Sequence, residues 1–343
     1  MKNKKTIKII ALALILAFAL SIFPSCSDKK IRSETFLEYF DTVTTVSANA
    51  SEKDFSKILE ISSEALEKYD KLFDIYNEYE GINNLCTVNK NAGKVPTPVA
   101  SEIIELLEYS KEMYTLTGGK VNIAMGSVLS IWHSYRDAGL KDSENASLPP
   151  KDLLVEASKH TDINAIELNK ENNEVYISDE KLSIDVGAIA KGFAVERLAK
   201  RLEKEGFTSV LISAGGNVRT IGPKTDGKPW TVAISDPEGE NDYPAILEIS
   251  DSSVVTSGSY QRFYTVDGKN YHHIIDPETL MPSEYFVSVS ICVKDSALAD
   301  VLSTVLFIID EEEGRIMCEK LDAEALWIYP SGEISMTKGF PKK

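Results

Sequence analysis

Two adjacent histidines, His272 and His273, lie in the segment TSGSYQRFYTVDGKNYHHIIDPETLMP, which spans residues 256–282. They are two of only four histidines in the chain. Adjacent residues on a strand point to opposite faces, so one can face a site while the other is buried or solvated. A neutral imidazole accepts a proton from a hydroxyl nucleophile near pH 7. The pair is therefore a candidate general base, although a structural histidine explains the pattern equally well.

An acidic residue lies inside the apolar segment ALADVLSTVLF, residues 297–307. Asp300 and Thr304 are four residues apart and share one face of the helix that this segment predicts. A carboxylate surrounded by Leu, Val and Phe costs free energy unless it is paired. Together, the carboxylate and hydroxyl oxygens suit a hard cation such as Mg²⁺. The alternative is that Asp300 caps the helix while Thr304 bonds back to it.

Two glycine-containing segments could approach a ligand closely. In IDVGAIAKGFAVERLA (184–199), small side chains leave one helix face nearly free of bulk, where a large flat ligand could lie beside Lys191. In TGGKVNIAMGS (117–127), two glycines before a helix leave backbone N–H groups accessible to an anion. Tight helix–sheet packing in the first segment and an ordinary turn in the second are the alternatives.

The elements that must position these residues follow from hydrophobic periodicity. Strands outnumber helices without a regular βαβ alternation, which favours an α+β fold over a doubly wound sheet. No break in composition divides residues 36–343, so we expect one compact catalytic domain. The predicted helices are 56–73, 101–116, 151–160, 187–205 and 297–309. The predicted strands are 36–48, 166–168, 174–177, 182–184, 209–213, 230–234, 246–250, 253–257, 263–266 and 286–293.

The first 25 residues differ from the rest of the chain. A lysine-rich start precedes an apolar stretch at 9–20, which is too short for a stable membrane span and typical of a secretory signal peptide. Cys26 follows directly and resembles the lipidated cysteine of a bacterial lipoprotein. We therefore predict a signal peptide (1–25), a lipidated Cys26 with a tether (26–35), and anchoring at the extracytoplasmic face of the cell membrane. The alternative is a soluble secreted protein with an incidental cysteine.

Composition limits the possible functions. Hydrophobic residues form 43% of the 343-residue chain and charged residues 26%, which argues against a largely disordered protein and against a multispan membrane protein. The net charge of −16 repels phosphates, so we expect no nucleic-acid partner. A phosphorylated ligand would need local cations, of which a metal ion is the obvious candidate. The remaining cysteines, Cys86, Cys292 and Cys318, are far apart and form no CxxC motif, so they indicate no zinc site.

Taken in order, several segments resemble the ApbE family of FAD:protein FMN transferases, and the lipoprotein-like N-terminus agrees with this. The resemblance implies one mixed-sheet domain with packed helices, similar to the T-fold. The matching segments are FDTVTTV (40–46), GGKVNIAMGSVLSIW (118–132), IDVGAIAKGFAVERLA (184–199), SAGGNVRTIG (213–222), KPW (228–230), residues 256–282 and ALADVLSTVLF (297–307).

The resemblance also implies an activity. Such enzymes bind FAD and Mg²⁺ and transfer FMN to a Thr or Ser hydroxyl of a target flavoprotein, releasing AMP. His273 would be the base that activates this hydroxyl, and Ala188 (through its carbonyl), Asp300 and Thr304 would hold Mg²⁺. The residues expected to contact FAD or to shape the substrate wall are Phe40, Lys120, Val121, Asn122, Asp185, Lys191, Ser257, Gly258 and Tyr260.

The chain departs from the family pattern at two places. Phe40-Asp41-Thr42 stands where many members have Met-Gly-Thr, and Asn122 stands where many have Asp. Two other activities fit much of the same sequence. One is a Mg²⁺-dependent FAD pyrophosphatase, with water as the acceptor. The other is a flavin-binding lipoprotein without turnover, which the Asp300 and Thr304 pair disfavours because binding alone needs no positioned metal.

Overall fold

The computed structural model describes residues 30–237, 239 and 243–343. The predicted signal peptide, Cys26 and the start of the predicted tether lie outside the described residues. Within the described ranges, no helix has the length and apolar character needed to cross a membrane.

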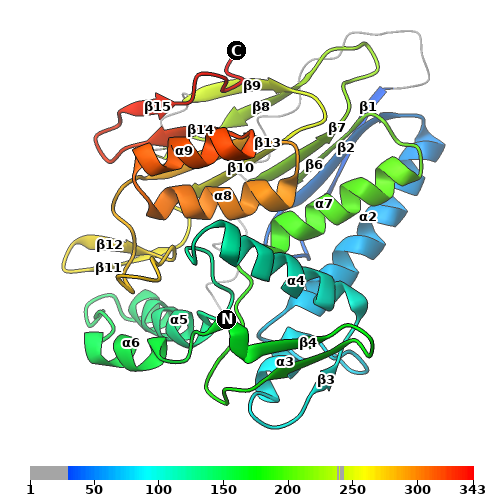
Figure 1. Cartoon of the computed structure of the whole chain (residues 1–343). Helices are drawn as coiled ribbons and strands as arrows, with labels where there is room; N and C mark the ends of the chain where they lie inside the picture. The colour runs from blue at the N-terminus through cyan, green and yellow to red at the C-terminus, as the bar shows by residue number, and fades with distance from the viewer. Residues whose placement is uncertain (1–29, 238, 240–242) are drawn as a thin grey trace.

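Eight antiparallel strands form the central sheet (Figure 1). Their side chains alternate between its two faces: Val255 packs with the helices, whereas Val254 packs with a hairpin on the opposite face. The strand order is β1 (Lys30–Phe36), β2 (Thr44–Ala50), β6 (Val210–Ala214), β7 (Asn217–Ile221), β10 (Ser253–Gly258), β13 (Ser288–Val293), β14 (Glu324–Ile328) and β15 (Ile334–Met336).

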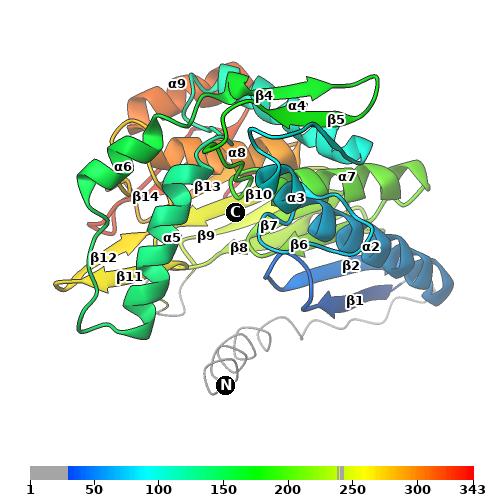
Figure 2. The same ribbon diagram turned by 90° about the horizontal axis from the view of Figure 1, so that it is seen from below.

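Four helices cover one face of this sheet, and a two-stranded hairpin covers the centre of the other (Figures 1 and 2). Helix α7 packs against both α2 and α8, and α8 also contacts β10 and β13. The helices are α2 (Glu52–Phe73), α7 (Ala190–Lys204), α8 (Ser296–Ile308) and α9 (Glu311–Leu321), and the hairpin is β8 (Trp230–Ile234) with β9 (Ala245–Ile249).

Two smaller groups of elements extend from the helical side (Figure 2). In the first, α5 packs against α6 and against the hairpin β11–β12, and in the second α3 packs on a three-stranded sheet. The first group contains α5 (Gly126–Lys141), α6 (Lys151–Ser158), β11 (Phe263–Val266) and β12 (Lys269–His272). The second contains α3 (Leu85–Lys90), β3 (Thr97–Pro98), α4 (Ser101–Leu116), the short helix η2 (Ile163–Ala165), β4 (Ile166–Asn169) and β5 (Glu174–Ile177).

The α+β class is confirmed, and the predicted helix 101–116 and strands 174–177, 230–234 and 263–266 have the predicted bounds. The central sheet is antiparallel rather than mixed, because the neighbouring strands of every described pair run in opposite directions. Residues 182–184 form no strand; Ser183 makes only an isolated bridge with Met125.

The N-terminal strand prediction is wrong in one respect. The segment 36–48 is not one strand but the end of β1, a turn and most of β2, because Phe40 and Asp41 adopt left-handed backbone conformations with φ of 53° and 49°. Strand β1 begins at Lys30, so residues 30–35 of the predicted tether belong to the sheet. The prediction also missed β3, β7, β12, β14, β15, α3 and α9.

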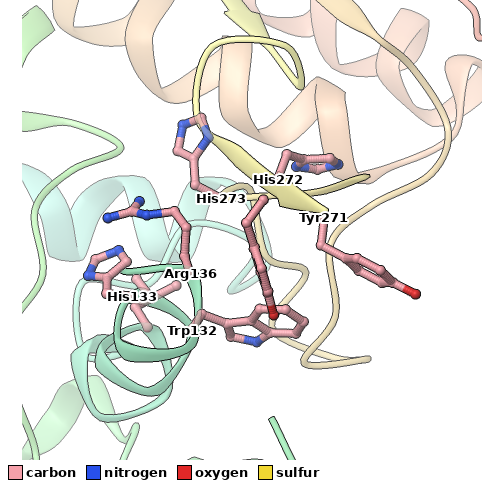
Figure 3. Close-up of a pocket in the computed structure, with 8 residues that line it drawn as sticks. Trp132, His133, Arg136, Tyr271, His272 and His273 are labelled. Carbon is pink, nitrogen blue, oxygen red and sulfur yellow. The ribbon is translucent and has the colours of Figure 1, made fainter. Parts of the chain in front are cut away.

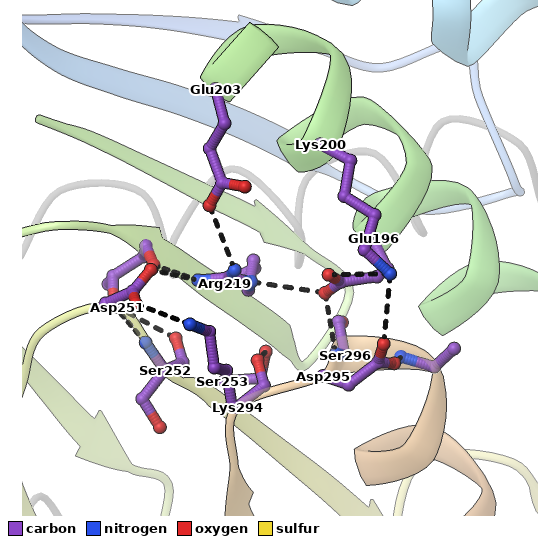
Figure 4. A network of polar contacts seen from close by, with 12 residues as sticks. Glu196, Lys200, Glu203, Arg219, Asp251, Ser252, Ser253, Lys294, Asp295 and Ser296 are labelled. Atoms are coloured by element: carbon purple, nitrogen blue, oxygen red, sulfur yellow. Dashed lines mark hydrogen bonds and ion pairs between the residues drawn. The ribbon is translucent and has the colours of Figure 1, made fainter. Parts of the chain in front are cut away.

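A buried arginine connects the sheet to the helical layer (Figure 4). Arg219 on β7 is 1% exposed and pairs with Glu196 and Glu203 of α7 at 3.1 Å each, and with Asp251 at 3.4 Å. The Glu196 carboxylate also accepts the backbone N–H of Ser296, the first residue of α8, at 2.9 Å. Arg219 therefore compensates the charge of a buried carboxylate that touches both helices.

We expect Arg219→Met to destabilise the fold by about 3–5 kcal/mol, because it leaves the buried Glu196 with only the half-exposed Lys200, at 3.4 Å, as a cation. Urea unfolding followed by circular dichroism measures the change. The control Lys228→Met removes an exposed pair with Asp226 and should cost under about 1 kcal/mol. Equal effects of the two substitutions would contradict this account of Arg219.

Candidate active site

Helices α7 and α8 approach each other closely at Gly192 and Asp300. The backbone N–H of Gly192 donates to Oδ2 of Asp300 at 2.8 Å, and Asp300 is only 6% exposed. A Cβ at position 192 would lie 2.5 Å from the carbonyl oxygen of Ser296 and closer still to Cβ of Asp300. Only glycine fits here without displacing a helix. The small side chain at 192 thus serves a close contact between two helices, which neither interpretation of the small-residue pattern had predicted.

This contact leaves a carbonyl oxygen free. In a regular helix the N–H of residue 192 would donate to the carbonyl of Ala188, but here it donates to Asp300. Among the described residues, neither the Ala188 carbonyl nor the Thr304 hydroxyl has a hydrogen-bond partner. Asp300 does not cap α8, because Asp295 does so by accepting the N–H groups of Ala297 and Leu298. The capping alternative for Asp300 and Thr304 is therefore wrong.

The free oxygens suit a hard divalent cation. They comprise a carboxylate, a hydroxyl and a backbone carbonyl, which is an oxygen-only set of the kind that Mg²⁺ takes together with water. Burial raises the pKa of Asp300, while the nearby Lys191 lowers it. No cluster of three or more His, Cys, Asp or Glu that could hold a metal occurs in the described residues, and this set contains only one such side chain.

Lys191 lies beside this oxygen set. Its ammonium donates to the carbonyl of Gly215 in the turn between β6 and β7, at 3.2 Å. Burial lowers its pKa, the Asp300 carboxylate raises it, and the charge of Arg262 lowers it further. Within the described residues Lys191 forms no ion pair, so its charge remains available to an anion.

His273 meets the geometric requirement for a base. Its Nδ1 lies 3.2 Å from the carbonyl oxygen of Arg262, which can only accept, so Nδ1 carries the proton and Nε2 is free to accept one. Burial and the charge of Arg262 lower the pKa of His273 to about 3, so the ring is neutral near pH 7. His272 is buried instead, with Nε2 2.6 Å from the carbonyl of Ser283. His272 is therefore held by the protein itself, whereas His273 has a ring nitrogen free, and its role as a base stays a prediction.

A pocket beside His273 contains further polar groups (Figure 3). The rings of His273 and His133 and the guanidinium of Arg136 gather on one side of it. His133 also lies within 3.3 Å of the Tyr76 hydroxyl, and the Asp185 carboxylate raises its pKa against a larger effect of burial. The charge of Arg262 lowers the pKa values of both His273 and Lys191.

The predicted ligand contacts at 120–122 are occupied within the protein. Lys120 pairs with Glu278 at 2.8 Å, and Val121 is buried in the core. The Asn122 side chain donates to the carbonyl of Thr161 and accepts from the N–H of Ala124. These side chains hold the loop in place, and their role toward FAD stays a prediction.

The remaining predicted contacts surround the ends of β10 and α7. Ser257 shares a 2.8 Å hydrogen bond with Ser303 of α8, and Gly258 lies under the Tyr260 ring, where no Cβ would fit. Oδ1 of Asp185 accepts the N–H of Gly187 and so shapes the turn before α7.

Comparison with known proteins identifies the fold. A sequence model of the ApbE family matches residues 40–327. The chain belongs to the ApbE family. The FAD:protein FMN transferase of Treponema pallidum is 32% identical over 271 residues, which cover 74% of this chain and 73% of that protein. The Escherichia coli K12 protein of the same name is 26% identical over 276 residues, or 78% and 76% of the two chains.

Two solved structures have the same architecture. The ApbE protein from Thermotoga maritima superposes with a TM-score of 0.80 and 26% identity, covering 92% of this chain and 100% of that one. The flavin transferase ApbE from Vibrio cholerae, at 22% identity and a TM-score of 0.74, covers 90% and 97% and shows the fold alone.

The structure explains one departure from the ApbE pattern. Asp41 replaces the glycine of Met-Gly-Thr, and its φ of 49° is the left-handed conformation that favours glycine and that Asp tolerates better than most residues. Phe40 keeps its place because its backbone N–H donates to Asp70 at 2.7 Å. Asp41 therefore fits a left-handed turn that a glycine at this position would also adopt.

Sequence reasoning missed three residues of this ApbE site. His133 and Arg136 carry no distinctive motif and reach His273 only because α5 packs against β11. Arg262 lies in a matched segment, but its carbonyl, not its side chain, fixes the tautomer of His273.

Gly192→Ala should destabilise the protein by about 1–3 kcal/mol, because the added methyl group forces α7 and α8 apart. Chemical unfolding measures the loss. Gly187→Ala is a matched control, since its Cβ would meet only Oδ1 of Asp185, at 3.1 Å. A tolerated Gly192→Ala would contradict the close approach of the two helices.

Stability should fall as the pH drops below about 6.5, because burial lowers the pKa values of His133, His272 and His273 in the folded protein. The unfolded chain then binds more protons, so the stabilisation present above pH 6.5 is lost towards acid. For His273 this loss is on the order of 1–2 kcal/mol between pH 8 and pH 5. Urea unfolding at both pH values should show a weaker pH dependence for His273→Asn than for the wild type; an unchanged dependence would be inconsistent with a neutral His273.

Proposed function

We propose that this ApbE-family protein transfers FMN from FAD to a Thr or Ser hydroxyl of a target flavoprotein and releases AMP. The family membership and the relatives named FAD:protein FMN transferase support the activity. The observation that carries it is the combination of two features. The first is the set of oxygens from Ala188, before α7, and from Asp300 and Thr304 on α8; the second is the free Nε2 of His273.

The reaction exchanges one phosphoester for another. The acceptor oxygen forms a bond to the FMN-side phosphorus, the bond from this phosphorus to the bridging oxygen breaks, and AMP leaves. His273 takes the hydroxyl proton at Nε2, while its Nδ1–H remains bonded to the carbonyl of Arg262. Lys191 holds the pyrophosphate by charge, without an internal ion pair to break.

Ala188, Asp300 and Thr304 would hold Mg²⁺, which supplies charge neutralisation for the pyrophosphate. Asp300 keeps its orientation because Gly192 fixes Oδ2. Asp185, Lys191 and Phe40 remain the proposed FAD contacts, with Ser257, Gly258 and Tyr260 as the wall.

We also propose attachment to the extracytoplasmic face of the membrane through a lipidated Cys26. Only residues 27–29 separate Cys26 from the first residue of β1. A lipid there would therefore hold the β1 edge of the sheet close to the membrane surface, where membrane-bound flavoproteins are within reach.

Incubation of the protein with FAD, Mg²⁺ and a flavoprotein domain bearing a Thr acceptor should produce in-gel flavin fluorescence on the domain. His273→Asn should lower the transfer rate by about 10²–10⁴-fold, because the hydroxyl loses its proton acceptor, while FAD affinity stays within about threefold. His160→Asn is the control, since His160 pairs with Asp179 at 2.7 Å outside this site.

Three results would count against the proposal. Unchanged transfer by His273→Asn would remove this residue from the base role. Transfer that persists in EDTA would show that the reaction needs no divalent metal ion. Free FMN and AMP without a labelled target would identify the protein as a pyrophosphatase.

A further inference from the structure

Asn217, the first residue of β7, is fully buried, and yet neither its amide nitrogen nor its amide oxygen has a hydrogen-bond partner. Leaving buried polar groups unpaired costs about 1–3 kcal/mol each. Most such groups in folded proteins are paired with protein or with water, so a side chain with both ends unpaired requires an explanation. One explanation is a ligand shell that the side chain serves.

The position of Asn217 points to the proposed cation site. Asn217 and Arg219 are two residues apart on β7 and so face the same side of the sheet, toward α7 and α8. Arg219 contacts Glu196, which accepts the N–H of Ser296. Gly192 lies one helical turn from Glu196 on α7, and Asp300 lies one helical turn from Ser296 on α8. The proposed cation site is therefore about one helical turn from the Arg219 contacts.

A second observation places the start of β7 at the proposed cation site. The ammonium of Lys191 donates to the carbonyl of Gly215, two residues before Asn217, at 3.2 Å. Lys191 directly precedes Gly192, whose N–H donates to Asp300 at 2.8 Å. The contact of Lys191 with Gly215 therefore sets the start of β7 at the level of the Asp300 carboxylate.

We propose that Asn217 is a positioning residue of the metal site, whose amide hydrogen-bonds to Asp300 and to water in the shell of a bound divalent cation. Mg²⁺ keeps several waters when bound to protein, and those waters need partners. Outer partners of this kind typically contribute 10–100-fold to metal affinity. This inference rests on the proposed function only in taking the Asp300 oxygens as the cation site.

Two titrations test the role of Asn217. FAD binding without metal is followed by flavin fluorescence, and Mg²⁺ binding is then measured by calorimetry with FAD saturating. Asn217→Ala should weaken Mg²⁺ binding at least tenfold, leave metal-free FAD affinity within about twofold, and leave the melting temperature of the ligand-free protein unchanged or higher, because an unpaired polar group is removed. Ser209→Ala is the control, because it removes a hydroxyl that is also buried and unpaired. Ser209 directly precedes β6 and lies at the end of this strand away from the β6–β7 turn, so the substitution should leave Mg²⁺ affinity unchanged.

The charged variant gives an independent readout. Asn217→Asp should lower the melting temperature of the ligand-free protein, because two buried carboxylates repel, and Mg²⁺ should raise it by more than in the wild type. Mg²⁺ affinity within twofold of wild type in Asn217→Ala, or no added stabilisation of Asn217→Asp by Mg²⁺, would overturn the inference. A wild type that binds Mg²⁺ but transfers no FMN would instead refute the proposed function and leave this role intact.

Discussion

The structure depends on an exchange of hydrogen bonds between two helices. Glu196 on α7 accepts the first N–H of α8, and Asp300 on α8 accepts the N–H of Gly192 on α7. Each helix thus provides one carboxylate that accepts a backbone N–H of the other helix. A shift of either helix along its axis by a single residue, about 1.5 Å, would break both hydrogen bonds. The free oxygens of the site exist only while this register holds, because the Ala188 carbonyl is released by the same N–H that fixes Asp300.

The two carboxylates of this exchange have opposite electrostatic surroundings. Glu196 is compensated permanently by the buried Arg219 and by Lys200. Asp300 has no ion-pair partner in the described part of the chain and only the nearby charge of Lys191, whose ammonium is held by a carbonyl. An acidic protein therefore keeps one buried carboxyl group without an ion pair at the place where a dication can bind. The bound cation then reverses the local sign for a phosphate ligand.

Residue types and spacing were sufficient to predict the groups that have an intrinsic cost or reactivity. Asp300 stands out because an acid in an apolar helix requires a partner, and the adjacent histidines stand out by their chemistry. Asn217 could not be recognised in this way, because an asparagine after two glycines is ordinary in a turn. Its burial follows from the pairing of β6 with β7 and from the helices above them. The break at Phe40 and Asp41 was missed for a related reason: their left-handed conformations are imposed by tertiary contacts such as that between Phe40 and Asp70.

The low pKa of His273 has a consequence for the order of events. Besides burial, the charges of Arg262 and Arg136 are among its causes, so the ring of the ligand-free protein is a weak base. An anionic pyrophosphate bound among these groups would offset the two guanidinium charges and shift the pKa of His273 back toward its ordinary value. The base would then gain strength only when the substrate is in place. In the proposed reaction, proton acceptance at Nε2 would thereby be coupled to FAD binding, since the guanidinium groups that would attract the phosphates also lower the pKa of the ring.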